Sequence, residues 1–168
     1  MKLTGFKEII CIGLCSIFLT IDCSTAQEKL LFDLKRVADK PRPDVEKILG
    51  PPSKLVDDVF RSSRGYRYPA VRATYMNGAI EVTYLEGGVR YLKIWVQKLD
   101  GKYQEYSYPE DAWKLLGDLG LDRNTEADLS TPTVTRWRHL PDIYEIHVFA
   151  TAEKQIWYVH VLTSRIYE

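Results

Sequence analysis

The amino-acid sequence predicts an α+β fold: two helix-plus-antiparallel-strand repeats that form one curved sheet, with the helices on one face. Two observations support this prediction. A seven-residue phrase, residues 44–50, recurs at residues 111–117 with the same Asp, Lys, Leu and Gly positions. After each copy the hydrophobic period changes from helical to alternating, which is typical of half-buried strands. A repeated order of elements indicates an internal duplication.

The chain divides into four predicted segments. Residues 1–26 are expected to be a signal peptide, because Lys2 and Lys7 precede an apolar run and small residues surround a cleavage site after Ala26. The run, residues 9–21, is shorter than the roughly 20 residues that a bilayer-spanning helix needs. The other segments are an N-terminal helix in residues 27–42, a first repeat in residues 43–100 and a second repeat in residues 101–168.

The positions of the cysteines indicate the cellular compartment of the protein. Cys11, Cys15 and Cys23 all lie in the predicted leader, so its removal would leave a chain without disulfides or zinc–thiolate sites. We expect an exported protein, periplasmic or secreted. The alternative is a lipoprotein anchored through Cys23, although Asp22 replaces the small residue that usually precedes a lipidated cysteine. Membrane association is expected only in that case.

The net charge and the aromatic content of the chain indicate which class of partner to expect. The chain carries 23 basic and 23 acidic residues, and a balanced charge without a basic run argues against nucleic acid as a partner. Eleven tyrosines and four tryptophans are instead typical of half-buried strands and of binding surfaces.

The first repeat begins with a short helix that Pro43 starts and Gly50 ends. Residues 53–65 are polar and predict a loop or a short strand. Three strands then follow at residues 68–76, 79–85 and 89–98. They are joined by Asn77-Gly78, which strongly favours a tight hairpin turn, and by a second glycine-rich turn.

The second repeat is expected to follow the same order. A fourth short strand is predicted at residues 103–108, before a helix that starts at Pro109 and ends at Gly117. A polar loop follows in residues 122–132. The last three strands are predicted at residues 133–140, 143–151 and 155–163.

The helix phrase in residues 44–52, followed by the strand and turn in residues 84–89, resembles the SmpA/OmlA (BamE-like) family of small exported proteins. The doubled arrangement resembles the β-lactamase inhibitory protein (BLIP) family. This resemblance implies a BLIP-like scaffold that binds a protein in outer-membrane assembly, or inhibits a secreted enzyme, without catalysis. The disulfides expected of the inhibitor family are absent.

Strand alternation predicts the binding residues. One face of each strand packs under the helices, and the other is free for a partner. Aromatic side chains flanked by charges on a free face are typical of an interface core. Alternation does not determine the face of Trp137, but the predicted set includes it. The set that we expect to contact a protein partner is Tyr91, Lys93, Trp95, Trp137, His147, Tyr158 and His160.

No catalytic site, cofactor or metal site is predicted. The chain has no Gly-x-Ser-x-Gly elbow, and no glycine-rich loop opens a helix. His147, His160 and Glu145 are ligand types that metals use, but their spacing matches no compact metal motif. The expected function is a non-catalytic exported protein-binding module. The alternatives are a periplasmic small-ligand-binding or sensor protein that uses the aromatic sheet face, and an enzyme without a recognisable motif.

Overall fold

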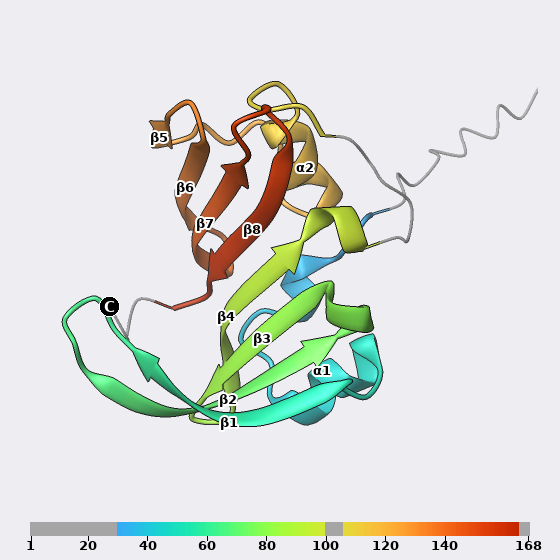
Figure 1. Cartoon of the computed structure of the whole chain (residues 1–168), viewed down its shortest axis with the longest axis vertical. Helices are drawn as coiled ribbons and strands as arrows, with labels where there is room; N and C mark the ends of the chain where they lie inside the picture. Colours follow the sequence, from blue (N-terminus) through green and yellow to red (C-terminus); the bar gives the residue numbers. More distant parts are fainter. Residues whose placement is uncertain (1–29, 100–105, 165–168) are drawn as a thin grey trace, which may run out of the picture.

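The computed structural model describes residues 30–99 and 106–164. Its strands form one antiparallel sheet of eight strands in the order β1-β2-β3-β4-β8-β7-β6-β5 (Figure 1). Each half of the order is a series of neighbouring antiparallel strands, and the pairing of β4 with β8 joins the halves. The strands are β1 (Lys54–Arg61), β2 (Arg67–Tyr75), β3 (Ile80–Leu85), β4 (Gly88–Trp95), β5 (Leu129–Ser130), β6 (Val134–Leu140), β7 (Ile143–Ala150) and β8 (Ile156–Leu162).

The helices are short. The two α-helices are α1 (Arg42–Leu49) and α2 (Ala112–Asp118), and three single 3-10 turns are η1 (Leu34–Arg36), η2 (Met76–Gly78) and η3 (Val96–Lys98). Pro41 and Gly50 flank α1 and confine it to two turns, since proline fits a helix start and Gly50 adopts a φ of 79° at its end. No helix in the described ranges is long and apolar enough to cross a bilayer.

The predicted fold class, an α+β fold of two helix-plus-strand repeats, is wrong. Strands take up 45% of the described residues and helices only 19%, so this is a mostly β protein built on one eight-stranded sheet. The error has a physical reason. Residues 54–61 pair charged with apolar side chains without strict alternation and bury little, as an edge strand can, so their polarity predicted a loop or only a short strand.

Two further elements differ from the sequence prediction. Residues 27–42 were expected to contain a helix, but within the described residues 30–41 only the single turn η1 forms. Here backbone groups bond across the molecule: Leu31 N–H donates to Asp118 at 2.9 Å and Val89 N–H donates to Lys40 at 2.9 Å. The predicted signal peptide and the first half of the predicted strand at 103–108 lie outside the described residues. In residues 106–108 the structure shows only an isolated bridge between Ser107 and Gln155.

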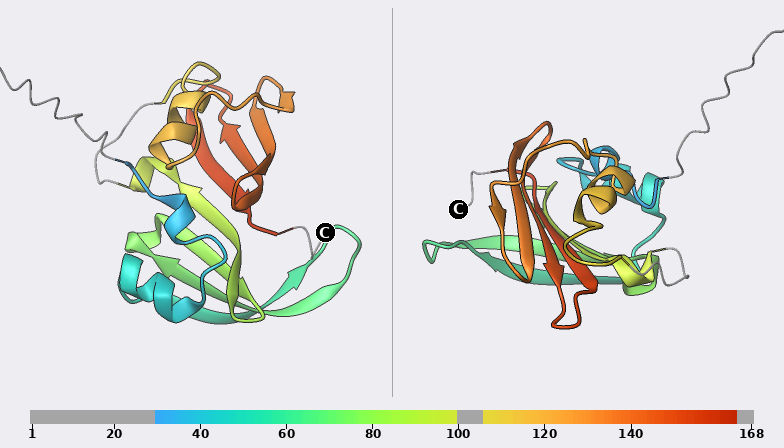
Figure 2. Two further views of the ribbon diagram at one scale, coloured as in Figure 1. Left: turned by 180° about the vertical axis from the view of Figure 1, so that it is seen from behind. Right: turned by 90° about the horizontal axis from the view of Figure 1, so that it is seen from above.

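The sheet has one covered face and one free face. Both α-helices lie in front of it when the molecule is seen from behind, and behind it in the opposite view (Figures 1 and 2). We call the helix-covered face the inner face and the other the outer face. Alternation places the largest apolar side chains of the central strands on the inner face, where each is at most 3% exposed: Tyr75, Ile80, Val82, Tyr84, Leu92, Ile94, Trp137, Ile146, Val148, Val159 and Val161.

A single main core lies under the helices. Val45 from α1 and Leu115 and Leu116 from α2 join the inner-face side chains in one cluster, together with Leu34 and Val37 from the N-terminal segment. Each of these five side chains is fully buried. Burying a large aliphatic side chain contributes about 1.5–3 kcal/mol, so this layer supplies much of the driving force for folding. It also leaves the outer face without a helix above it.

Candidate functional site

The outer face of the three central strands carries a continuous set of aromatic, histidine and lysine side chains. The register of β4, β8 and β7 sets Lys93 opposite His160, and His160 opposite His147. One row along, Trp95 lies opposite Tyr158. Directly opposed side chains lie within contact distance, so residues distant in sequence meet here.

The rings pack against one another. Tyr158 stacks on Phe149 at 4.7 Å between ring centres and contacts Trp95 at 5.3 Å. His160 meets Tyr91 edge-on at 5.2 Å and Phe149 at 5.0 Å. Aromatic pairs at these separations add about 0.5–1.5 kcal/mol to area burial. We call this set the outer aromatic cluster: Tyr91, Trp95, Phe149, Trp157, Tyr158 and His160.

Trp157 and Lys93 determine the surface chemistry of the outer aromatic cluster. Trp157 is 45% exposed, although its ring contacts Trp95 at 5.5 Å and Tyr158 at 4.8 Å. Lys93 Nζ lies 4.1 Å from the centre of the Trp95 ring and 4.5 Å from that of Tyr158. The cluster therefore presents a large apolar ring beside a cation–π contact, and tryptophan and tyrosine are enriched in protein interfaces.

A hollow lies beside the cluster. The β1–β2 hairpin extends well beyond the rest of the sheet (Figure 1), and Phe60 of β1 closes one side of the hollow. Two adjoining cavities, of about 350 and 230 Å³, share Phe60, Tyr91 and His160 in their walls. The larger one adds Arg72 and Lys93 to its lining. Its size suits a side chain or a small organic molecule.

The two histidines in the hollow are neutral near pH 7. Burial, reinforced by the nearby charge of Lys93, lowers the pKa of His160 to about 4. Burial also lowers the pKa of His147, although Glu145 Oε1, 2.7 Å from His147 Nε2, acts in the opposite direction. His160 Nε2 is buried and has no hydrogen-bond partner among the described residues. A buried polar atom of this kind favours a ligand or water that could bond to it.

Ion pairs hold the far side of the hollow. Arg138 Nε donates to Glu145 Oε2 at 2.6 Å, which anchors the carboxylate that borders His147. Arg136 donates three hydrogen bonds to Asp128, at 2.8, 3.1 and 3.3 Å. The arginine neighbours hold the pKa of Asp128 below its ordinary value, against the effect of its own burial. These charges are mutually compensated, whereas no ion pair with a described residue is found for the half-buried Lys93.

Within the described ranges, no group of three or more His, Cys, Asp or Glu side chains is arranged to hold a metal ion. The pair His147 and His160, with Glu145, is therefore a polar wall of the hollow.

The structure places the seven predicted contact residues in two different environments. Six lie on the outer face near one another: Tyr91, Lys93, Trp95, His147, Tyr158 and His160. Trp137 does not join them. It is fully buried on the inner face, where it meets Trp113 of α2 edge-on at 5.6 Å and donates from Nε1 to the Thr125 carbonyl at 3.1 Å. Trp137 therefore does not belong to the outer-face binding surface that the sequence predicted.

Three residues of the site were absent from the predicted set. Phe149 follows from alternation with His147, and alternation alone would have included it. Trp157 lies next to a register shift between Phe149 and Ala150, which changes the facing of the strand end. Phe60 belongs to the segment predicted as a loop or a short strand, and no local signal indicates that it lies beside Tyr91.

Comparisons with known proteins add no name: no protein family, curated protein or solved structure matches this chain. The resemblance to the SmpA/OmlA and BLIP families therefore stays a prediction from the sequence.

Proposed function

We propose that the protein is a non-catalytic binding protein that holds a protein partner on the outer face of its sheet, through the outer aromatic cluster and Lys93. The observation that carries this proposal is the exposure of Trp157 beside Trp95 and Tyr158 on a face that no helix covers. A tryptophan that remains 45% exposed exposes apolar area that a partner would bury. Tryptophan and tyrosine are also enriched among residues that dominate binding energy.

Site-specific crosslinking tests the proposal. The photoreactive residue benzoylphenylalanine replaces Trp157 in one variant and Lys114, an exposed residue of α2, in the matched control. Each full-length variant is irradiated in the cells that produce it. We expect one crosslinked protein of defined mass from position 157 and none from position 114. Equal products from both positions, or none from position 157, would contradict the proposal.

A second reading is that the hollow binds a small ligand, in the manner of a carrier or sensor. The specific observation in its favour is the cavity of about 350 Å³, with Phe60, Tyr91 and the unpartnered His160 Nε2 in its walls. Native mass spectrometry of the purified protein separates the two functions. A co-purifying small molecule that Phe60→Ala releases would favour the ligand, whereas an unliganded mass with intact crosslinking at position 157 favours the protein partner.

We also propose export, with cleavage after Ala26. The support is the leader-like sequence of residues 1–26 and the absence of cysteine after Cys23. N-terminal sequencing of the mature protein tests it, and an intact N-terminus would contradict it. Labelling with a palmitate analogue that is lost in Cys23→Ala would show the lipoprotein form instead.

A further inference from the structure

The two edges of the sheet differ. At one edge, β5 has two residues, too few to guide the pairing of another strand. At the other edge, β1 runs for eight residues, and no described backbone group pairs with it on the side away from β2. A long free edge is a template for an added strand, and natural proteins normally shorten or cover such an edge.

The side chains of β1 also leave apolar area and one charge exposed. Leu55 and Val59 are 47% and 42% exposed, so apolar area flanks the centre of the strand. Asp57 is exposed and forms no ion pair with any described residue. Asp58, in contrast, already contacts Arg72 at 3.3 Å and accepts a hydrogen bond from the Val59 N–H at 2.8 Å. One uncompensated carboxylate therefore lies at the middle of the edge.

We propose that β1 binds an extended segment of another protein as a ninth strand, and that this segment carries a lysine or arginine opposite Asp57, between apolar residues. This site is separate from the outer aromatic cluster and goes beyond the proposed function. Backbone pairing would supply the affinity, while Asp57, Leu55 and Val59 would select the side chains. An oppositely charged cross-strand pair is favourable by about 0.2–1 kcal/mol.

A second copy of this chain is a poor occupant. If two β1 strands pair antiparallel over their whole length, Asp57 faces Asp58 and Lys54 faces Arg61 in both directions. Like charges directly opposite each other are destabilising. The charge pattern of β1 therefore disfavours self-pairing and favours a partner with a basic centre.

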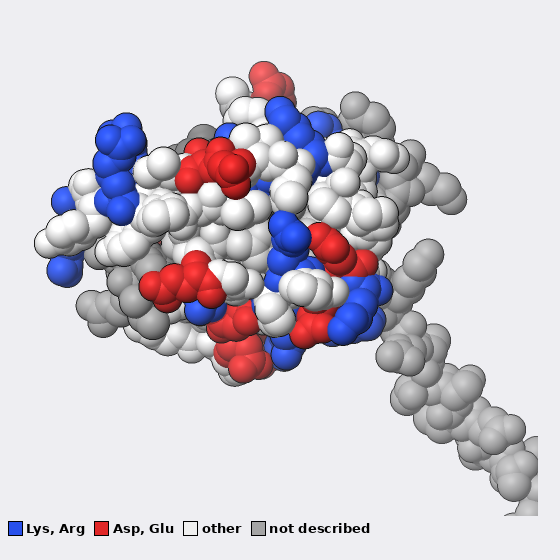
Figure 3. Space-filling view, turned by 90° about the horizontal axis from the view of Figure 1, so that it is seen from below, with Lys and Arg blue, Asp and Glu red and all other residues white. Residues whose placement is uncertain are grey.

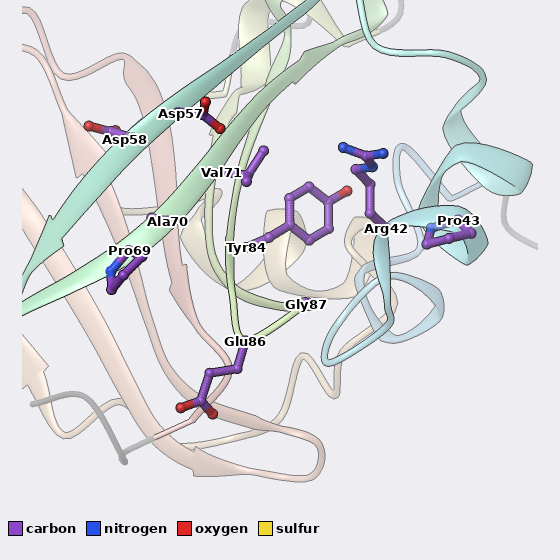
Figure 4. Close-up of a pocket in the computed structure, with 10 residues that line it drawn as sticks. All are labelled: Arg42, Pro43, Asp57, Asp58, Pro69, Ala70, Val71, Tyr84, Glu86 and Gly87. Atoms are coloured by element: carbon purple, nitrogen blue, oxygen red, sulfur yellow. The ribbon is translucent and has the colours of Figure 1, made fainter.

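The inner side of β1 offers room for that basic side chain. A cavity of about 460 Å³ lies between β1, β2 and α1 (Figure 4). Asp57, Val71 and Tyr84 point into it from the sheet, and Arg42 borders it from α1, whereas Asp58 and Glu86 point away. Arg42 Nε lies 3.2 Å from Glu46, so its charge is partly compensated within α1. A partner's ammonium could therefore reach Asp57 along an apolar floor.

The charges around this side of the molecule agree with the proposed chemistry. Seen from below, the side on which β1 lies in Figure 1, acidic side chains occur in several patches across the middle (Figure 3). Basic side chains lie at the end formed by the β1–β2 turn and also among the acidic patches (Figure 3). The acidic patches fit a partner with a basic centre.

The test uses a fluorescein-labelled peptide, Thr-Val-Thr-Lys-Thr-Val-Thr, with the full-length protein; its Lys and two Val side chains share one face, as Asp57, Leu55 and Val59 do on β1. Fluorescence anisotropy measures its affinity, and hydrogen–deuterium exchange locates it. We expect slower exchange of the β1 amides and an affinity that falls with added salt. Asp57→Asn should weaken binding about three-fold, in line with one lost cross-strand charge pair. Asp142→Asn, a matched change in the turn between β6 and β7, should leave it unaltered.

Two control peptides test the backbone and the charge separately. A peptide with N-methylated amides at alternate residues should not bind, and one with Glu in place of Lys should bind more weakly. Equal binding of the N-methylated peptide, or protection of β4 and β8 in place of β1, would overturn the proposal. So would a concentration-dependent dimer in analytical ultracentrifugation that Asp57→Asn strengthens, because the edge would then belong to a second copy. Crosslinking at position 157 is independent of each result.

Discussion

The Lys93 ammonium lies 4.1 Å from the centre of the Trp95 ring, two residues along the same strand on the same face of the sheet. The same ammonium lies 4.5 Å from the Tyr158 ring of the neighbouring strand. The Lys93 cation therefore contacts one indole ring and one phenol ring. This contact links β4 to β8, and the pairing of these two strands connects the two halves of the sheet. Both the stability of the sheet and the proposed binding surface depend on this seam.

Replacing Lys93 by Gln is expected to lower the free energy of unfolding by about 0.5–1 kcal/mol, because a partly exposed cation–π contact is lost. Urea unfolding at pH 7.5 measures the change. Lys98→Gln is the matched control, since Lys98 Nζ lies 5.4 Å from the Trp95 ring and should cost less. A larger loss for Lys98→Gln than for Lys93→Gln would contradict the assignment of the stabilising contact to Lys93.

Two tryptophans are expected to differ sharply in their contribution to stability. Trp137→Ala should cost about 3–5 kcal/mol, because the side chain is fully buried against Trp113 and its removal leaves a cavity. Trp157→Ser should cost less than about 1 kcal/mol, since the side chain is 45% exposed. Thermal and urea unfolding compare the two variants. Similar losses for both would show that Trp157 is structural, and would remove the main support for the outer face as a binding surface.

The stability of the protein should fall as the pH falls from about 6.5 to about 4. His160 has a pKa of about 4 in the folded protein, whereas an unfolded histidine titrates near 6.5. In that window the unfolded chain binds a proton that the folded protein does not, so acid favours unfolding. After allowance for solvent screening, the loss is about 2 kcal/mol. Above pH 6.5 both states are neutral and this contribution is constant.

Urea unfolding at a series of pH values tests this dependence. His160→Gln should flatten the difference curve between pH 6.5 and 4, while the effects of the carboxylates remain common to both proteins. His147 shifts in the same direction, so His147→Gln should flatten the curve as well. Parallel curves for the wild-type protein and His160→Gln would show that His160 is not buried as described.

A buried hydroxyl pair gives a further stability prediction. Tyr75 Oη and Tyr84 Oη lie 2.8 Å apart on the inner face, and burial raises the pKa of both phenols. Tyr84→Phe should cost about 1–2 kcal/mol, because it leaves the Tyr75 hydroxyl without this partner. Replacing both residues by Phe should cost less than the sum of the single changes. A double-mutant cycle by urea unfolding measures the coupling, and strict additivity would contradict it.

Much of the strand structure could be predicted from local sequence. The strands that became β2, β3, β4, β6, β7 and β8 were all expected within a few residues of their observed ends, because apolar residues alternate along them and turn residues separate them. The short helices were also placed correctly. The error lay in the importance given to the helices, because α1 and α2 only cover part of a sheet. The segment that forms the eight-residue strand β1 was predicted as a loop or a short strand.

The candidate site was partly predictable for the same reason. Alternation within β4, β7 and β8 indicates which side chains share a face. Alternation does not indicate the face on which Trp137 lies. The positive φ of 57° at His139 and the packing of α2 determine the environment of that strand. Alternation also does not indicate Phe60, whose contact with the hollow depends on the long β1–β2 hairpin.

The sequence by itself determined the local periods, the turns and the neutral overall charge, because these depend on residues close together in the chain. Tertiary structure decided what those elements became. The pairing of β4 with β8 brings Lys93 and Trp95 beside Tyr158 and His160, more than sixty positions away. Such contacts depend on strand register and on which faces the helices cover, and no local pattern encodes either. For that reason the aromatic outer face and the free edge of β1 emerge only in the folded protein.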